Sequence, residues 1–189
     1  MNRSFLGYLA IAVALSSAIA LSASADDSTF NGRKLIVRDG FKVSLAAGPG
    51  LADRPITAAL DETGALYVAD SSGSNDNVQK QLSDKPHKIV RLIDSDGDGQ
   101  YDQRTIFADR MMFPEGTMWY AGSLYVSAPP SIWKLTDTNG DGVADERVEW
   151  FQGKTLPGCA NDLHGPYHGP DGWIYWCKGA FATQTYPRP

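Results

Sequence analysis

Apolar and aromatic residues alternate with polar ones along short stretches of this chain, and Asp, Gly and Pro separate the stretches. The same strand, turn and strand pattern occurs three times, at residues 56–70, 113–127 and 163–179. β-branched and aromatic residues favour strands, while Asp, Pro and Gly supply the positive φ angles and side-chain hydrogen bonds of tight turns. Each stretch is therefore predicted to form an antiparallel hairpin.

Two further strands are predicted after each of the first two hairpins, at residues 87–93 and 104–107 and at residues 131–135 and 147–150. Four strands per unit is the composition of a β-propeller blade. Residues 71–86 are rich in Ser, Asn, Asp, Gln and Lys and are predicted to be a polar surface loop. No segment has a sustained 3.6-residue apolar period, so helices are expected to be minor.

The predicted fold class is all-β. Residues 26–189 are expected to form an incomplete arc of roughly three to four propeller blades, because each blade takes about forty to fifty residues. The chain stops soon after a strand-like segment, so we expect it to be the N-terminal fragment of a larger propeller.

The first residues have a different pattern. Arg3 precedes a run of seventeen apolar or small residues, 5–21, and the small residues Ala23 and Ala25 follow it before two aspartates. A basic start, an apolar centre and small residues at a cleavage site predict a secretory signal peptide over residues 1–25. The alternative is an N-terminal membrane anchor, because the run reaches the lower limit for spanning a bilayer. We expect an exported chain, periplasmic or extracellular.

Charge and hydropathy narrow the possible partners. The formal net charge is −5 and the chain has no basic tract, which argues against nucleic acid as a partner. No stretch after Ala25 is long and apolar enough to predict a transmembrane segment.

Two matching acidic loops lie 43 residues apart, each after the third predicted strand of its unit. Oxygen-bearing side chains at positions one, three and five, a main-chain carbonyl at position seven and a carboxylate at position nine approach the six to eight oxygens that calcium prefers. Glycines at positions four and six allow the tight curl that brings these oxygens together. The predicted ligands are Asp94, Asp96, Asp98, Gln100 and Asp102 in the first loop, and Asp137, Asn139, Asp141, Val143 and Asp145 in the second.

These loops differ from the calcium loop of a helix-loop-helix hand. Position twelve, which should be a bidentate Glu, is Thr105 in one loop and Val148 in the other, and the flanking segments are predicted strands. We therefore expect hairpin loops with calcium affinities on the order of 10⁻⁴ to 10⁻³ M, as in extracellular modules. The alternative is that Asp, Asn and Gly form ordinary hairpin turns without an ion.

The two cysteines, Cys159 and Cys177, bracket His164 and His168. In an exported chain a disulfide is possible, and two unlinked thiols are the alternative. The order Cys, His, His, Cys also suggests zinc, but its spacing matches no compact zinc module.

Several motifs resemble a known family. They are GFKV at residues 40–43, LYVAD at 66–70, the two acidic loops, FAD at 107–109 and NDLHGPYHGPDGWIYWCKG at 161–179. Together they resemble the propeller domain of large secreted proteins of planctomycete-type bacteria that are labelled membrane-bound dehydrogenase-like and often carry a c-type haem domain. More distantly, the turn at residues 169–172 is similar to the soluble quinoprotein glucose and sorbosone dehydrogenases.

The resemblance implies an oxidoreductase that acts on a sugar or polyol, with calcium and, in the full-length family, pyrroloquinoline quinone as cofactors. It also implies a histidine base upstream of the 169–172 turn, for which His164 is the nearest candidate, although the family spacing falls on Asn161. A redox partner or haem domain is implied for longer relatives, while this chain has no Cys-x-x-Cys-His motif for haem attachment. The alternative function is a non-catalytic, calcium-stabilised propeller module that binds a glycan or a protein.

Overall fold

The computed structural model describes residues 28–30, 32–154, 156 and 163–178 of the 189-residue chain. The predicted signal peptide, residues 1–25, lies outside the described residues. The chain divides into two compact units, Met1–Ser44 and Leu45–Pro189. In the first unit, β1 (Ser28–Phe30) pairs with β2 (Arg33–Leu35) in a short antiparallel hairpin.

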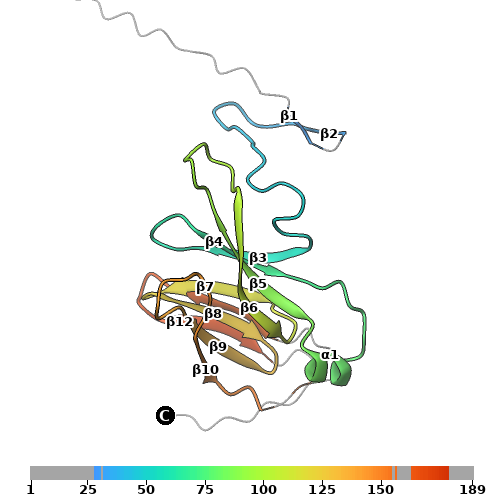
Figure 1. Ribbon diagram of the computed structural model, residues 1–189, viewed down its shortest axis with the longest axis vertical. Helices are drawn as coiled ribbons and strands as arrows, with labels where there is room; N and C mark the ends of the chain where they lie inside the picture. The colour runs from blue at the N-terminus through green and yellow to red at the C-terminus, as the bar shows by residue number, and fades with distance from the viewer. Residues whose placement is uncertain (1–27, 31, 155, 157–162, 179–189) are drawn as a thin grey trace, which may run out of the picture. The chain divides into compact units, whose positions relative to one another are not determined.

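The second unit is mostly antiparallel β-sheet, as predicted (Figure 1). Its first sheet has the order β3-β4-β5-β6, and its second has the order β10-β9-β8-β7, so both are simple meanders. A third sheet pairs β11 with β12. The strands are β3 (Pro55–Leu60), β4 (Leu66–Asp70), β5 (His87–Ile93), β6 (Gln103–Met111), β7 (Gly116–Tyr120), β8 (Ser123–Ala128), β9 (Ser131–Thr136), β10 (Glu146–Phe151), β11 (Leu163–His168) and β12 (Ile174–Lys178).

The first strand of the second sheet, β7, contacts the first strand of each of the other two sheets, β3 and β11. The first strands of successive sheets therefore lie side by side. The hydroxyl oxygens of Thr57 on β3 and Thr117 on β7 are 3.3 Å apart, and the Ser127 hydroxyl on β8 donates to the carbonyl of Gly165 on β11 at 2.6 Å. These contacts join the three sheets along one edge.

The main core lies between the two four-stranded sheets. Fully buried Ile89 and Phe107 from the first sheet and Leu124, Val126 and Leu135 from the second belong to one apolar cluster. Strand β8 is buried at all six positions, since its two faces pack against different clusters. Phe107 also contacts Tyr67 edge-on, with ring centroids 4.8 Å apart. Burying a side chain of this size stabilises the fold by about 1.5–3 kcal/mol.

One prediction is wrong in part. Residues 71–86 were predicted to be a loop, but they contain the helix α1 (Val78–Asp84). The Asn77 side chain caps the helix by accepting from the Lys80 N–H at 3.0 Å, and Lys85 ends the helix with a left-handed φ of 47°. Only two of its residues are buried, which is too few to produce a visible helical period.

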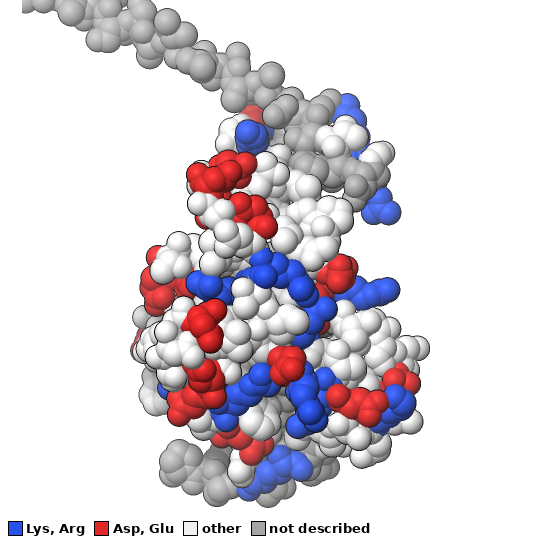
Figure 2. Space-filling model, in the orientation of Figure 1, with Lys and Arg blue, Asp and Glu red and all other residues white. Residues whose placement is uncertain are grey.

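Surface charges are interspersed, as Figure 2 shows for one face, where acidic and basic side chains lie next to one another. Among the described residues, no helix has the length and apolar character needed to cross a bilayer.

Candidate functional site

The first acidic loop connects β5 to β6, and the second connects β9 to β10. Both are therefore hairpin loops between the third and fourth strands of a four-stranded sheet, as predicted. Thr105 and Val148, at position twelve, lie within strands rather than helices. The glycines at positions four and six have φ between 76° and 90° in both loops, a region that L-residues rarely adopt.

Main-chain amides fold the first loop around its carboxylates. The N–H groups of Gly97 and Gly99 donate to the two oxygens of Asp94 at 2.7 and 2.9 Å. The Asp98 N–H donates to Asp96 Oδ1 at 3.2 Å, and the Gln100 N–H donates to Asp98 Oδ1 at 2.7 Å. The hydrogen bond from Gly99 is the main cause that lowers the pKa of Asp94 below its usual value.

This curl brings three carboxylates together. One oxygen from each of Asp94, Asp96 and Asp98 lies within 4.8 Å of the others. Asp102 is outside this group, since Ser95 donates its N–H and hydroxyl to that carboxylate at 3.1 and 2.6 Å. Within the part of the chain that the structure describes, this is the single cluster of three such groups.

The second loop repeats the hydrogen bonds of the first. Gly140 and Gly142 donate to Asp137 at 2.7 and 2.8 Å, Asp141 donates to the Asn139 side chain at 2.9 Å, and Val143 donates to Asp141 at 2.8 Å. Two loops of different sequence thus adopt one conformation.

At position nine of the second loop, Asp145 accepts from the Thr138 N–H and hydroxyl at 2.9 and 3.1 Å, and from the Asn139 amide at 2.9 Å. The hydrogen bond from the Thr138 N–H is the main cause that lowers the pKa of Asp145. In both loops, the ninth carboxylate fastens the end of the loop to its beginning.

Arg91 lies near both acidic loops. A Cβ added at Gly142 of the second loop would be 3.2 Å from Arg91 Nη1, and Arg91 also lines a cavity of about 340 Å³ together with Asp94 of the first loop. The Arg91 Nε–H donates to the Tyr67 hydroxyl at 3.2 Å, which in turn donates to Asp61 at 3.2 Å. Burial raises the pKa of Tyr67 to about 12.

His164 lies on β11 opposite Cys177 of β12, and its imidazole is about half exposed. Its Nδ1 is 4.0 Å from Oε2 of Glu115, a buried carboxylate just before β7 that also accepts from the Leu163 N–H at 3.3 Å. Sequence reasoning missed Glu115, because its contact with His164 depends on how β7 and β11 pack.

The other possible zinc ligands suggested by the sequence do not gather around His164. His168 stacks on Tyr120 with ring centroids 4.8 Å apart, and it lies four residues further along the strand, roughly 13 Å for extended chain. Cys177 is exposed on β12, and Cys159 lies outside the described residues. The disulfide therefore stays a hypothesis.

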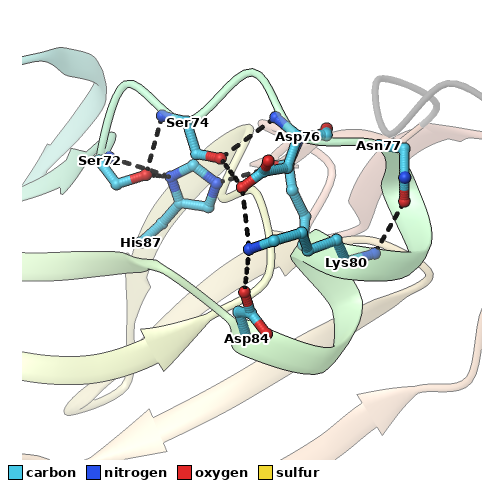
Figure 3. A network of polar contacts seen from close by, with 8 residues as sticks. Ser72, Ser74, Asp76, Asn77, Lys80, Asp84 and His87 are labelled. Atoms are coloured by element: carbon cyan, nitrogen blue, oxygen red, sulfur yellow. Dashed lines mark hydrogen bonds and ion pairs between the residues drawn. The ribbon is translucent and has the colours of Figure 1, made fainter.

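A second polar cluster that sequence reasoning missed surrounds His87 at the start of β5 (Figure 3). The Ser72 N–H donates to His87 Nδ1 at 3.1 Å, which fixes Nδ1 as an acceptor and leaves Nε2–H to donate to Gln81 Oε1 at 3.0 Å. Burial lowers the pKa of His87. Because Gln81 belongs to α1, this neutral histidine holds the helix against the sheet.

No curated protein matches the chain. The model of the family described as "Domain of unknown function (DUF7133)" matches residues 30–187, which include both acidic loops and His164. The chain therefore belongs to the DUF7133 family.

Proposed function

We propose that the chain is a calcium-stabilised module of the β-propeller type, in which each acidic hairpin loop binds one divalent ion. The carboxylate group in the first loop supports this proposal. Two oxygens on opposite sides of a calcium ion, each at about 2.4 Å, are about 4.8 Å apart. The oxygens of Asp94, Asp96 and Asp98 lie within 4.8 Å of one another, so one ion could contact all three.

Both loops keep these side chains pre-organised. The amide donors at positions four and six occupy one lone pair on each oxygen of Asp94 and Asp137, and a carboxylate oxygen has further lone pairs for a cation. A water molecule or the carbonyl of Gln100 or Val143 would supply additional oxygens. The nearby guanidinium of Arg91 offsets part of the negative charge, which favours modest affinity.

The propeller arrangement is part of the proposal. Two meander sheets of four strands, followed by the hairpin β11–β12, place their first strands next to one another in the order β3, β7 and β11. Successive blades around a central axis have this arrangement. The ions would then hold the two outer strands of each four-stranded blade together, and an exported chain would meet calcium at the concentrations such loops require.

Calcium titration of the thermal unfolding temperature tests this function. At a free calcium concentration 10 to 100 times the dissociation constant, each site adds roughly 1.4 to 2.7 kcal/mol to the free energy of unfolding. Replacing both Asp98 and Asp141 with Ala should abolish the increment. The matched control is Asp39→Ala with Asp53→Ala, which removes two exposed carboxylates outside the loops and should keep it. An increment of the same size in the loop variant would refute the proposal.

A second candidate function is oxidation of a sugar or polyol, and the pair formed by His164 and Glu115 favours it. A buried carboxylate beside an imidazole can orient the ring and stabilise its protonated form, as a general base requires. Pyrroloquinoline quinone, however, does not fit the described residues. The group that faces His164 is a carboxylate, which repels the carboxylates of the quinone, and neither described cavity is lined by His164.

Dye reduction across a panel of sugars, measured with and without added quinone, tests this second candidate. Activity should be lost in His164→Gln and retained in His168→Gln, because His168 lies on the same strand but stacks on Tyr120. A parent chain that reduces no dye with any sugar removes the candidate without affecting the calcium proposal.

A further inference from the structure

A pocket of about 150 Å³ lies away from both acidic loops, between the C-terminal end of α1, the end of β6, the β8–β9 turn and the outer strand β10. Its base is apolar. Met111 and Met112 are about 5% exposed, and the partly buried indole of Trp133 completes the lining. A cavity of this volume with an apolar lining accommodates one benzene-sized ring.

The rim of the pocket is basic. Lys85, Arg110 and Arg147 line it together with one acid, Glu149. Arg147 is already engaged, since its guanidinium donates to the carbonyl and to the carboxylate of Asp109 at 2.8 and 3.1 Å.

The other charged residues of the rim differ in whether they already have a partner. Glu149 is also engaged, because its two oxygens accept from the Ser131 hydroxyl at 2.6 Å and from the Gln152 amide at 3.3 Å. Within the described part of the chain, no carboxylate forms an ion pair with Lys85 or Arg110. Two uncommitted cations therefore stand beside an apolar base.

Both cations occupy unusual backbone conformations. Lys85 has a φ of 47° and Arg110 a φ of 53°, in the left-handed region that non-glycine residues seldom adopt. Arg110 is exposed near the end of β6, and the next two residues, Met111 at the strand end and Met112 just after it, are both buried. Lys85 adopts this conformation as the C-cap of α1, whereas that of Arg110 is backbone strain of the kind found at binding sites.

We propose that this pocket binds a small organic anion that has one ring and one carboxylate, with the ring on the two methionines and Trp133 and the carboxylate on Lys85 and Arg110. A carboxylate accepts charge-assisted hydrogen bonds from both cations, which a neutral alcohol cannot match. The apolar base requires the ring, so acetate alone is a poor ligand.

The test uses the full chain with ¹³C-methyl methionine and benzoate as the probe. The sequence has four methionines, of which Met118 packs in a different apolar cluster and serves as an internal control. Benzoate should shift the methyl signals of Met111 and Met112 saturably, with a dissociation constant on the order of 1 mM, and leave Met118 unchanged. Benzyl alcohol and acetate should each bind at least about tenfold more weakly.

Substitutions of the two cations test where the carboxylate of benzoate binds. Lys85→Asn and Arg110→Asn remove the charges and keep a residue that tolerates positive φ, and each should weaken benzoate about tenfold. Lys134→Asn, on β9 but outside the pocket lining, is the matched control and should bind benzoate as the parent does. Benzoate binding that is absent, that is matched by benzyl alcohol, or that is unchanged in the two pocket variants overturns the proposal. The alcohol comparison on the parent chain decides the question even where a variant fails to fold.

Discussion

Asp70, at the end of β4, is the buried carboxylate whose loss we expect to cost most. Its side chain is fully buried, and Oδ1 accepts from the N–H groups of Asp53 and Arg54 at 3.1 and 2.7 Å. Oδ2 has no hydrogen bond from any described residue and instead lies 3.3 Å from the ammonium of Lys88. One side chain thus fastens the segment that precedes β3 to the first sheet.

Two substitutions separate these roles. In Asp70→Ala both N–H groups lose their acceptor, and each hydrogen bond to a charged acceptor contributes about 1.5–3 kcal/mol. The substitution also removes the desolvation cost of a buried charge, which offsets part of this loss. We therefore expect the free energy of unfolding to fall by about 3 kcal/mol. In Asp70→Asn the amide oxygen can still accept both bonds. The two bonds lose the charge of their acceptor, and the amide NH2 replaces the oxygen that faces Lys88, which is about 30% exposed, so the expected loss is about 1–2 kcal/mol.

Urea unfolding followed by far-ultraviolet circular dichroism, with chelator present, measures both variants. A loss of about 3 kcal/mol corresponds to a fall in melting temperature of roughly 6–12 °C for a chain of this length. Equal losses of unfolding free energy in the Ala and Asn variants would show that Asp70 does not stabilise the fold through its two N–H hydrogen bonds. A loss below about 1 kcal/mol in Asp70→Ala would refute the reasoning entirely.

Three further predictions concern other buried groups. Because burial lowers the pKa of His87 below 6.5, the unfolded chain binds more protons as the pH falls below that value, and the free energy of unfolding decreases there. His87→Gln should remove this part of the pH profile in urea melts, and an unchanged profile would contradict it. The pKa of Tyr67 is raised to about 12, so stability should fall as the pH rises from 10 towards 12, and Tyr67→Phe should lessen the fall measured by circular dichroism. A Cβ at Gly116 would lie 1.6 Å from the carbonyl oxygen of Gly165, so Gly116→Ala should lose about 3 kcal/mol in urea melts, whereas Gly48→Ala, with nothing within 4 Å, should lose almost none. Equal stability of these two variants would show that β7 and β11 do not approach so closely.

The hairpins were predictable because local chemistry determines them. Residues 87–93 are a strand with the predicted bounds, and the Asp and Gly turn at residues 169–172 joins β11 to β12. The conformation of the two acidic loops follows in the same way, since Asp94 and Asp98 accept from amides two to five residues away and Asp102 accepts from the amide of Ser95, seven residues away.

Other features depend on how distant strands pack. Glu115 meets His164 only because β7 and β11 lie side by side, and no local pattern marks that pairing. The helix α1 is stabilised by the Asn77 cap and by Gln81 bonding to His87, which are single contacts rather than an apolar period. The basic pocket joins Lys85 and Arg110 from different elements, so its cations are scattered in the sequence.

Equilibrium dialysis with radioactive calcium tests the central claim most directly, because it counts the ions bound by the folded chain. We predict two ions per chain, one in each acidic loop, with dissociation constants on the order of 10⁻⁴ to 10⁻³ M, and one ion in either Asp98→Ala or Asp141→Ala. No saturable binding in that range, or two ions still bound after both substitutions, would contradict the account.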